Sequence, residues 1–329
     1  MSDWLIDALR SALVIAVLMT MMPYTTWFER RVLSGMQSRV GPNRVGPAGL
    51  LQPLADGLKL LFKEDIRPAN ADLWLYWLAP AIALFAALAT CAVIPFGPTI
   101  EIAGTSVPLV IADLPVGVLY LLGTSSLGVY ALVFGGWSSG SKYSLLGALR
   151  AAAQVVSYEL ILGLALVGVV IVHGSMSLGD IVAGQQRTVW TVLLQPVGFV
   201  LYLIAACAET NRAPFDLPEA ETELVAGYHT EYTGMRFALY FIAEYINMIT
   251  VSAIATTLYL GGYKGPFGLF DGVWWFVIKV LVMLFVYVWI RATLPRMRYD
   301  RLMNFGWRGL LPLALLNVFA TAVGILLFG

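Results

Sequence analysis

The chain has 329 residues, of which 59% are hydrophobic and 12% are charged, and its mean hydropathy is +0.80. A soluble domain carries about twice that share of charged residues. The composition therefore indicates a polytopic membrane protein rather than a soluble domain. The formal net charge is zero, so the overall charge gives no support to binding of nucleic acid.

The residue types that usually hold metals or nucleotides are sparse. Cys91 and Cys207 lie far apart in apolar segments, and the two histidines, His173 and His229, are also well separated. Isolated cysteines favour neither a disulfide framework nor a metal–thiolate site. The glycine-rich motifs that cradle nucleotide phosphates are missing from the sequence. We therefore expect this chain to hold no metal and no cofactor of its own.

Eight segments are apolar over about the 20 residues that a transmembrane helix needs. We predict an all-α polytopic membrane protein with about eight transmembrane helices, plus amphipathic surface helices on the cytoplasmic side, as a single membrane domain over residues 1–329. The sequence shows no internal repeat, which disfavours an inverted-repeat transporter. The predicted spans are roughly 4–28, 74–96, 108–134, 147–172, 189–209, 235–261, 272–293 and 308–328.

Lysine and arginine concentrate in the connections on one side of these spans. The connections on the other side carry only Arg10, Arg187 and Lys264. The positive-inside rule then predicts that both termini are periplasmic. The Ala- and Gly-rich spans favour a bacterial inner (plasma) membrane over a mitochondrial inner membrane. The predicted cytoplasmic loops are 29–73, 135–146, 210–234 and 294–307.

The first cytoplasmic loop combines a constrained turn with an amphipathic segment. Gly-Pro pairs at 41–42 and 46–47 bracket Arg44, and such pairs make turns. From Ala48 onward, leucines recur at helical spacing and predict a helix of about 15 residues along the inner membrane surface. The helix alone is explained as an interface anchor, whereas Arg39 and Arg44 on a constrained loop suit an acidic partner surface.

Two carboxylates lie inside predicted spans, where a charge is costly and therefore suggests function. Glu159 is in the middle of its span, about 180° around the helix from Arg150. It must therefore face another helix or a wet cavity. Glu244 shares a helix face with Tyr240 and Asn247.

More ionisable groups lie near the span ends: Glu29, Glu209 and Asp113, with Lys279 inside a span as a candidate partner for one of the acids. We weigh ion pairs between helices against a wet path that accepts protons. The acids outnumber the bases and occupy different spans, which favours the path. Burial among like charges raises carboxylate pKa values, so protons can reside there near neutral pH.

The segment from Glu209 to Tyr232 is the most acidic part of the chain. Asp216, Pro218 and Glu219 have the pattern of a helix start with a capping box, so we predict a helix to about Tyr228. Capping explains Asp216 and Glu219. It gives no role to the remaining acids of the segment, which are Glu209, Glu221, Glu223 and Glu231.

Three segments together resemble the signatures of a known family: GMQSRVGPNRVGPAGLLQPLADGLKLLFKED, GWSSGSKYSLLGALRAAAQVVSYE and ETNRAPFDLPEAETELVAGYHTEY. They are similar to the membrane-embedded H subunit of proton-pumping NADH–quinone oxidoreductase, the respiratory complex I, and the similarity covers essentially the whole chain. Membrane-bound hydrogenases and formate hydrogenlyases contain related subunits. The intact third segment resembles the quinone-reducing branch more closely.

The resemblance implies a subunit that joins the membrane arm to the soluble peripheral arm and forms much of the chamber for a lipid quinone. The quinone is a substrate, and FMN and iron–sulfur clusters belong to partner subunits. The implied partners are the peripheral-arm subunits with the quinone headgroup site and terminal iron–sulfur cluster, small and antiporter-like membrane subunits, and membrane lipids. No nucleic acid is implied.

The resemblance also assigns roles to residues of this sequence. The proton path takes Glu159, Glu209, Glu219, Glu221, Glu223, Glu231 and Glu244. The quinone chamber or a partner contact takes Glu29, Arg30, Arg39, Arg44, Asp56 and Phe215.

Two other functions compete with this interpretation. A self-contained ion transporter would use the same acids, but the missing repeat and the long cytoplasmic loops disfavour it. A passive membrane anchor for a soluble enzyme explains the basic loops and leaves Glu159 and Glu244 unexplained. Co-purification with flavin and iron–sulfur proteins distinguishes these functions. The residues leave open whether the quinone is ubiquinone or menaquinone.

Overall fold

A computed structural model describes residues 3–102, 105–187, 189–216, 226–265 and 271–328. Within these ranges, seven helices are long and apolar enough to cross a membrane, and Pro196–Glu209 is a shorter apolar helix. The described chain is otherwise short helices, loops and one antiparallel hairpin of β1 (Ile100–Ile102) and β2 (Thr105–Val107). The prediction of an all-α polytopic membrane protein with about eight spans is confirmed.

The helices follow the apolar segments of the sequence. The long ones are α1 (Asp3–Met36), α3 (Leu73–Thr90), α4 (Gly117–Ser138), α5 (Lys142–His173), α10 (Gly234–Tyr259), α11 (Val273–Thr293) and α13 (Leu311–Phe328). The shorter ones are α2 (Gln52–Phe62), α6 (Leu178–Arg187), α7 (Thr191–Leu194), α8 (Pro196–Glu209) and α12 (Tyr299–Asn304). A π-helical turn, Phe305–Leu310, joins α12 to α13.

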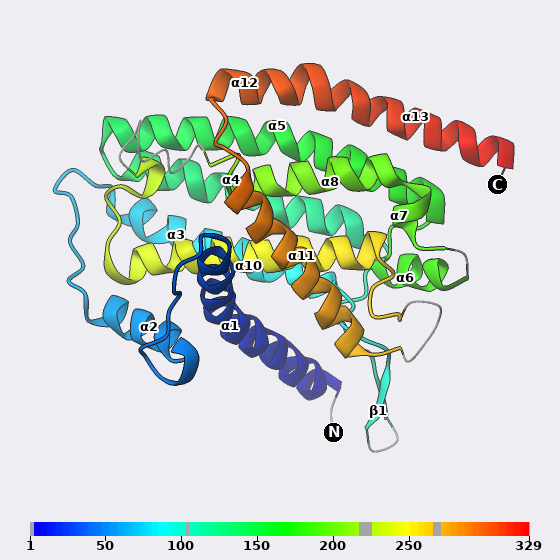
Figure 1. Cartoon of the computed structure of the whole chain (residues 1–329), viewed down its shortest axis with the longest axis horizontal. Coiled ribbons are helices and arrows are strands. Elements are labelled where there is room, and N and C mark those ends of the chain that lie inside the picture. Colours follow the sequence, from blue (N-terminus) through cyan, green and yellow to red (C-terminus); the bar gives the residue numbers. More distant parts are fainter. Residues whose placement is uncertain (1–2, 103–104, 188, 217–225, 266–270, 329) are drawn as a thin grey trace.

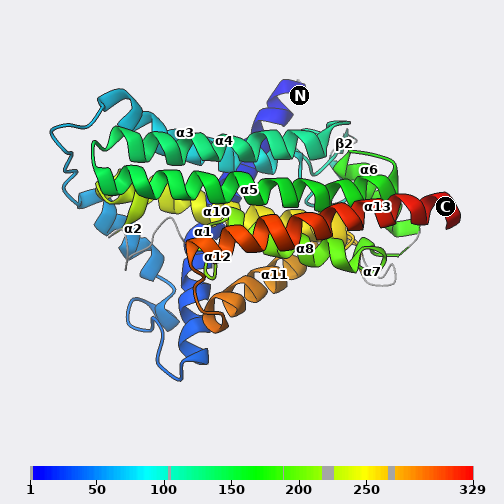
Figure 2. The same cartoon turned by 90° about the horizontal axis from the view of Figure 1, so that it is seen from above.

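Helix α10 forms the centre of the bundle. Nearly all of its side chains from Ala243 to Tyr259 are buried, as expected for a helix that is apolar around its whole circumference. It packs against α1, α3 and α11, and also contacts α2, α6 and α8. Figure 1 shows it in the middle of the molecule, and Figure 2 shows α5 running between α4 and α13.

Helices α1 and α2 form an arm beside this bundle. Both figures show α1 inclined to the other long helices, with α2 next to it. Both α1 and α2 contact α10. Helix α2 is amphipathic, as the leucine spacing predicts, and its apolar face includes the exposed side chains of Leu54, Leu58 and Leu61. The three helices therefore surround one corner of the molecule.

Several helix limits differ from the predicted spans for identifiable reasons. Helix α1 continues to Met36, so Glu29 lies within a helix instead of at the start of a loop. Helix α4 begins only at Gly117 because Pro108 and Pro115 precede it and disfavour helix before them. Residues 189–209 form two helices, since Pro196 has no N–H to continue α7 and starts α8 instead.

The helix predicted from Asp216 to about Tyr228 falls largely outside the described residues, which do not include 217–225. Glu219, Glu221 and Glu223 belong to this range. The described part resumes at Ala226 and forms a short 3₁₀ helix at Gly227–His229. The side of the membrane on which each loop lies stays a prediction.

Candidate functional site

A large cavity occupies the corner between α1, α2 and α10. Its volume is about 690 Å³, and most of its lining is apolar, with Met19 and Tyr24 from α1, Leu54 from α2, and Phe237 and Phe241 from α10. This volume is in the range of cavities that hold drug-sized or lipid-like molecules. The lining suits a long apolar ligand.

One ion pair lies on the wall of this cavity. Arg30 Nη1 is 2.7 Å from Asp56 Oδ2, and Gln52 Nε2 donates to the other carboxylate oxygen, Oδ1, at 2.9 Å. The pair joins α1 to α2. Because both charged groups are partly exposed, the pair contributes little to stability. Its main effect is to place a charged pair on the wall of a mostly apolar cavity, which Lys59 also lines.

The loop before α2 folds back on α1 and so positions the outer wall of the cavity. Trp27 Nε1 and Arg31 Nη2 both donate to the carbonyl of Ala48, each at 3.2 Å. Gly49 has φ of +75°, and a Cβ there would lie 2.2 Å from the carbonyl oxygen of Pro42. Glycine is therefore required at this close approach.

A network of charged side chains lies beside the cavity. Glu29 on α1 is 3% exposed and accepts hydrogen bonds from Tyr245 on α10, at 2.6 Å, and from Arg291 on α11. Arg212 Nε is 3.0 Å from Glu244 Oε1, and its guanidinium lies 4.4 Å from the centre of the Tyr245 ring. The network thus joins α1, α10, α11 and the loop after α8.

Two of the acids for which ion pairs were weighed against a wet path have basic partners. For Glu29 and Glu244 the alternative of ion pairs between helices holds. The sequence places Arg212 and Arg291 in or beside loops. A turn with φ of +52° at Asn211 brings Arg212 back toward α10, and α11 continues through Arg291 to Thr293. Tyr245, Arg212 and Arg291 are the members of the network that the sequence does not single out as site residues.

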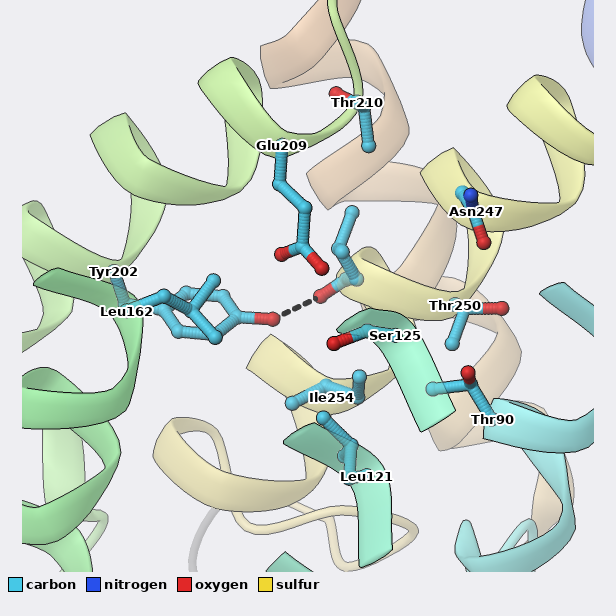
Figure 3. A pocket seen from close by; sticks show the side chains of 11 residues that line it. Thr90, Leu121, Ser125, Leu162, Tyr202, Glu209, Thr210, Asn247, Thr250 and Ile254 are labelled. Atoms are coloured by element: carbon cyan, nitrogen blue, oxygen red, sulfur yellow. Dashed lines mark hydrogen bonds between the residues drawn. The ribbon is translucent and has the colours of Figure 1, made fainter. Parts of the chain in front are cut away.

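A second, polar cavity lies deeper in the bundle (Figure 3). It is small, about 20 Å³, which is enough for about one water molecule. Glu209, the last residue of α8, points its carboxylate into this space. Ser125, Thr210 and Asn247 contribute further polar groups. No basic side chain is among its described lining residues.

Glu209 and Glu159 are close enough to interact electrostatically. Glu159 is half-buried on α5, which packs against α8. Two carboxyl groups from neighbouring helices therefore lie near each other in the bundle.

Polar side chains of α1 and α10 lie along these helices between the residues that line the two cavities. Arg30 on the wall of the large cavity is next to Glu29 in the chain, and Glu29 is bonded to Tyr245. Glu244 precedes Tyr245 in the chain. Glu244 and Asn247 are three residues apart, so these two side chains are neighbours on the surface of α10. Asn247 lines the polar cavity into which Glu209 points.

The other predicted site residues lie elsewhere. Arg39 and Arg44 are exposed on the loop before α2. Glu231 is half-buried, and its backbone carbonyl accepts a hydrogen bond of 2.7 Å from Tyr76. Phe215 is 5% exposed and lines a separate apolar cavity rather than the large one.

Lys279 has a different environment from the one expected. Its ammonium group donates to the carbonyls of Leu260, Gly262 and Lys264, at 2.5, 3.0 and 2.6 Å, and lies 4.6 Å from the centre of the Trp190 ring. Lys279 thus binds the carbonyls of the turn that follows α10 rather than pairing with Glu159, Glu209 or Glu244.

The end of the acidic segment at Tyr232 packs into a cluster of aromatic rings. Tyr232 stacks on Tyr76, with ring centres 4.3 Å apart, and Tyr228 and His229 are in edge contact. Burial lowers the pKa of His229 to about 4, so its imidazole is neutral near pH 7. Burial also raises the pKa of Tyr232. The cluster anchors one end of the acidic segment against α3 and α10.

Among the described residues, no three His, Cys, Asp or Glu side chains are grouped so that they could hold a metal ion.

Comparisons with known proteins give a consistent result. The family model described as NADH dehydrogenase matches residues 9–322. The H subunit of the NADH-quinone oxidoreductase of Thermomicrobium roseum is 59% identical over 98% of this chain and 97% of the relative. One such H subunit of Geobacter sulfurreducens is 54% identical over 97% of this chain and 96% of the relative. The H subunit of Protochlamydia amoebophila is 54% identical over 91% of each chain.

Proposed function

The chain belongs to the NADH dehydrogenase family, and we propose that it is the quinone-chamber and coupling subunit of an H⁺-translocating NADH–quinone oxidoreductase. The matches over most of the chain confirm the family that the three sequence segments resemble. In this proposal the chain holds no redox cofactor, and FMN and iron–sulfur clusters reside in partner subunits. Its place is a bacterial inner membrane, with periplasmic termini and the peripheral arm on the cytoplasmic side.

The proposed quinone chamber is supported by the cavity of 690 Å³ between α1, α2 and α10. An isoprenoid tail is long and apolar, and the lining of this cavity is apolar along three helices. Transfer of such a tail from water to an apolar lining is favourable in proportion to the area covered. The headgroup site is completed by soluble subunits, for which the exposed Arg39 and Arg44 provide a basic contact surface.

The polar groups between the two cavities support the coupling role. Reduction of a quinone changes the charge near Arg30 and Glu29, and Glu29 is bonded to both Tyr245 and Arg291. A buried carboxylate can change its proton affinity by several pKa units when a neighbouring charge changes. Each unit corresponds to about 1.4 kcal/mol. A few coupled acids, ending at Glu209 and Glu159, therefore suffice to carry part of the redox energy.

A photoreactive quinone with the reactive group on its isoprenoid tail tests the chamber in inner-membrane vesicles. We expect labelling of peptides from α1, α2 and α10, and competition by unlabelled quinone. Labelling confined to other helices, or labelling that unlabelled quinone does not reduce, would contradict the proposed quinone chamber.

A further inference from the structure

A third cavity lies on another part of the molecule and is not used by the proposed function. Its volume is about 240 Å³, and it lies between α8, α11 and the π-helical turn after α12. Two of its lining side chains are exposed, Leu294 at 51% and Phe305 at 38%, so the cavity opens to the outside. All the described lining residues are uncharged: Leu203, Ile204, Cys207, Pro214, Phe215, Ile290, Leu294, Met297 and Phe305.

The walls of this cavity are held by contacts between distant parts of the chain. The backbone N–H of Met297 donates to the carbonyl of Pro214 at 3.1 Å. The hydroxyl of Tyr158 donates to the carbonyl of Leu302 at 3.0 Å, and its ring lies against Phe215. The cavity is therefore formed before any ligand enters it.

Exposed arginines lie next to the lining residues in the chain, and we call these arginines the rim. Arg296 and Arg298 flank the lining residue Met297, and Arg301 is one helical turn before the lining residue Phe305. All three arginines are exposed. Asp300 is the one acid in residues 291–308, and it pairs with Arg298 at 3.0 Å. The rim therefore keeps an excess of positive charge.

An aromatic side chain marks the same region. Trp307 is 49% exposed, and its Nε1 donates to Ser157 Oγ at 3.2 Å. Tryptophan is enriched where a membrane helix meets the headgroup layer. The basic rim and the apolar cavity thus lie where a phospholipid has its headgroup and the start of its chains.

We propose that this cavity and its arginine rim bind an anionic phospholipid, with one acyl chain in the cavity and the phosphate group on Arg296, Arg298 and Arg301. Guanidinium groups bind phosphate oxygens in paired hydrogen bonds, and clusters of arginine beside a membrane helix attract anionic lipids. A neutral quinone would leave the rim without a counter-charge. A partner helix, about 10 Å across with its side chains, is too thick for the cavity.

Binding there also has a consequence for α11. Ile290 and Leu294 line the cavity on either side of Arg291, which donates to Glu29. A bound acyl chain therefore packs against the end of α11 that supplies this arginine.

The test uses the whole enzyme in nanodiscs of phosphatidylcholine that contain a photoactivatable lipid with its reactive group on the acyl chain. Photoactivatable phosphatidylglycerol is expected to label peptides 203–215 and 290–305 several-fold more than photoactivatable phosphatidylcholine does. The variant Arg296→Gln/Arg298→Gln should lose this preference. The matched control Arg67→Gln/Lys142→Gln removes two exposed positive charges elsewhere and should keep it.

A second variant separates loss of binding from loss of folding. Met297→Trp fills the cavity but leaves the rim arginines, and should reduce labelling by either lipid while thermal unfolding stays cooperative. Equal labelling by the two lipids, or an unchanged preference in the rim variant, overturns the proposal. So does labelling of these peptides by a photoreactive quinone in place of phosphatidylglycerol. The readout does not depend on quinone reduction, so failure here leaves the proposed function intact.

Discussion

Tyr245 on α10 donates a hydrogen bond of 2.6 Å to Oε2 of Glu29 on α1. This bond joins the central helix of the bundle to the inclined helix that forms one wall of the large cavity. The Tyr245 ring also lies under the guanidinium of Arg212, which is paired with Glu244. Through one side chain, therefore, the chamber wall contacts the charged groups of the bundle.

Removal of this bond should affect function more than removal of a similar bond elsewhere does. A hydrogen bond to a charged group contributes about 2 kcal/mol and one to a neutral carbonyl about 1 kcal/mol. Tyr245→Phe should therefore lower thermal stability moderately and slow quinone reduction in vesicles. Tyr259→Phe, which removes a hydroxyl that donates to the carbonyls of Ala165 and Gly198, should lower stability alone. Equal quinone reduction by the two variants would contradict a role for Tyr245.

Arg236 is expected to be a stability determinant of the loop between α2 and α3. Its guanidinium pairs with Asp65 at 2.9 Å and lies 3.9 Å from the centre of the Trp77 ring. Loss of a desolvated cation–π contact costs about 2 kcal/mol. Arg236→Met should lower the unfolding temperature in detergent and expose residues 63–72 to protease. Asp65→Asn keeps the ring contact and should cost less, so an equal cost would refute this assignment.

The half-buried His229 should make stability depend on pH. Its pKa in the folded chain is about 4, below the ordinary value of 6.5. Between these values the unfolded chain binds more protons, so folding stability falls as pH falls from about 6.5 to about 4 and is fully present above that range. We expect His229→Gln to show a flatter dependence of unfolding temperature on pH across this range. An unchanged slope of unfolding temperature against pH would mean that groups other than His229 cause the pH dependence.

A side chain added inside the large cavity should hinder long-tailed quinones. Gly57 lines this cavity, and a Cβ at this position meets nothing within 4 Å. Gly57→Phe should raise KM for a long isoprenoid quinone several-fold and change it less for a short-tailed analogue, because only the long tail needs the volume. Gly324→Phe is the control, since Gly324 also has open space but does not line the cavity.

Local patterns were sufficient to predict most of the fold. The apolar segments predicted the helices, and the leucine spacing after Ala48 predicted α2. Helix limits deviated where proline interrupted them, as at Pro196, or where a charged turn stayed helical, as at Glu29. These deviations depend on packing and on the positions of single prolines, which average hydropathy does not record.

The site was less predictable because it depends on contacts between distant residues. Glu159, Glu209 and Glu244 could be identified as acids in apolar surroundings, but their partners could not. The pair of Arg212 and Glu244 requires the turn at Asn211. The bond between Tyr245 and Glu29 spans 216 positions of the chain. Neither relationship leaves a periodic signal in the sequence.

The central claim is that Glu209 and Glu159 convert quinone reduction into proton movement. The most direct test measures protons pumped per electron in inner-membrane vesicles from Glu209→Gln and Glu159→Gln strains, with Glu101→Gln, an exposed acid of the hairpin, as the control. Since glutamine is close in size but cannot carry a proton, both variants should retain assembled enzyme and pump several-fold fewer protons per electron, and the control should not change. A full proton-to-electron ratio in both variants would contradict the account.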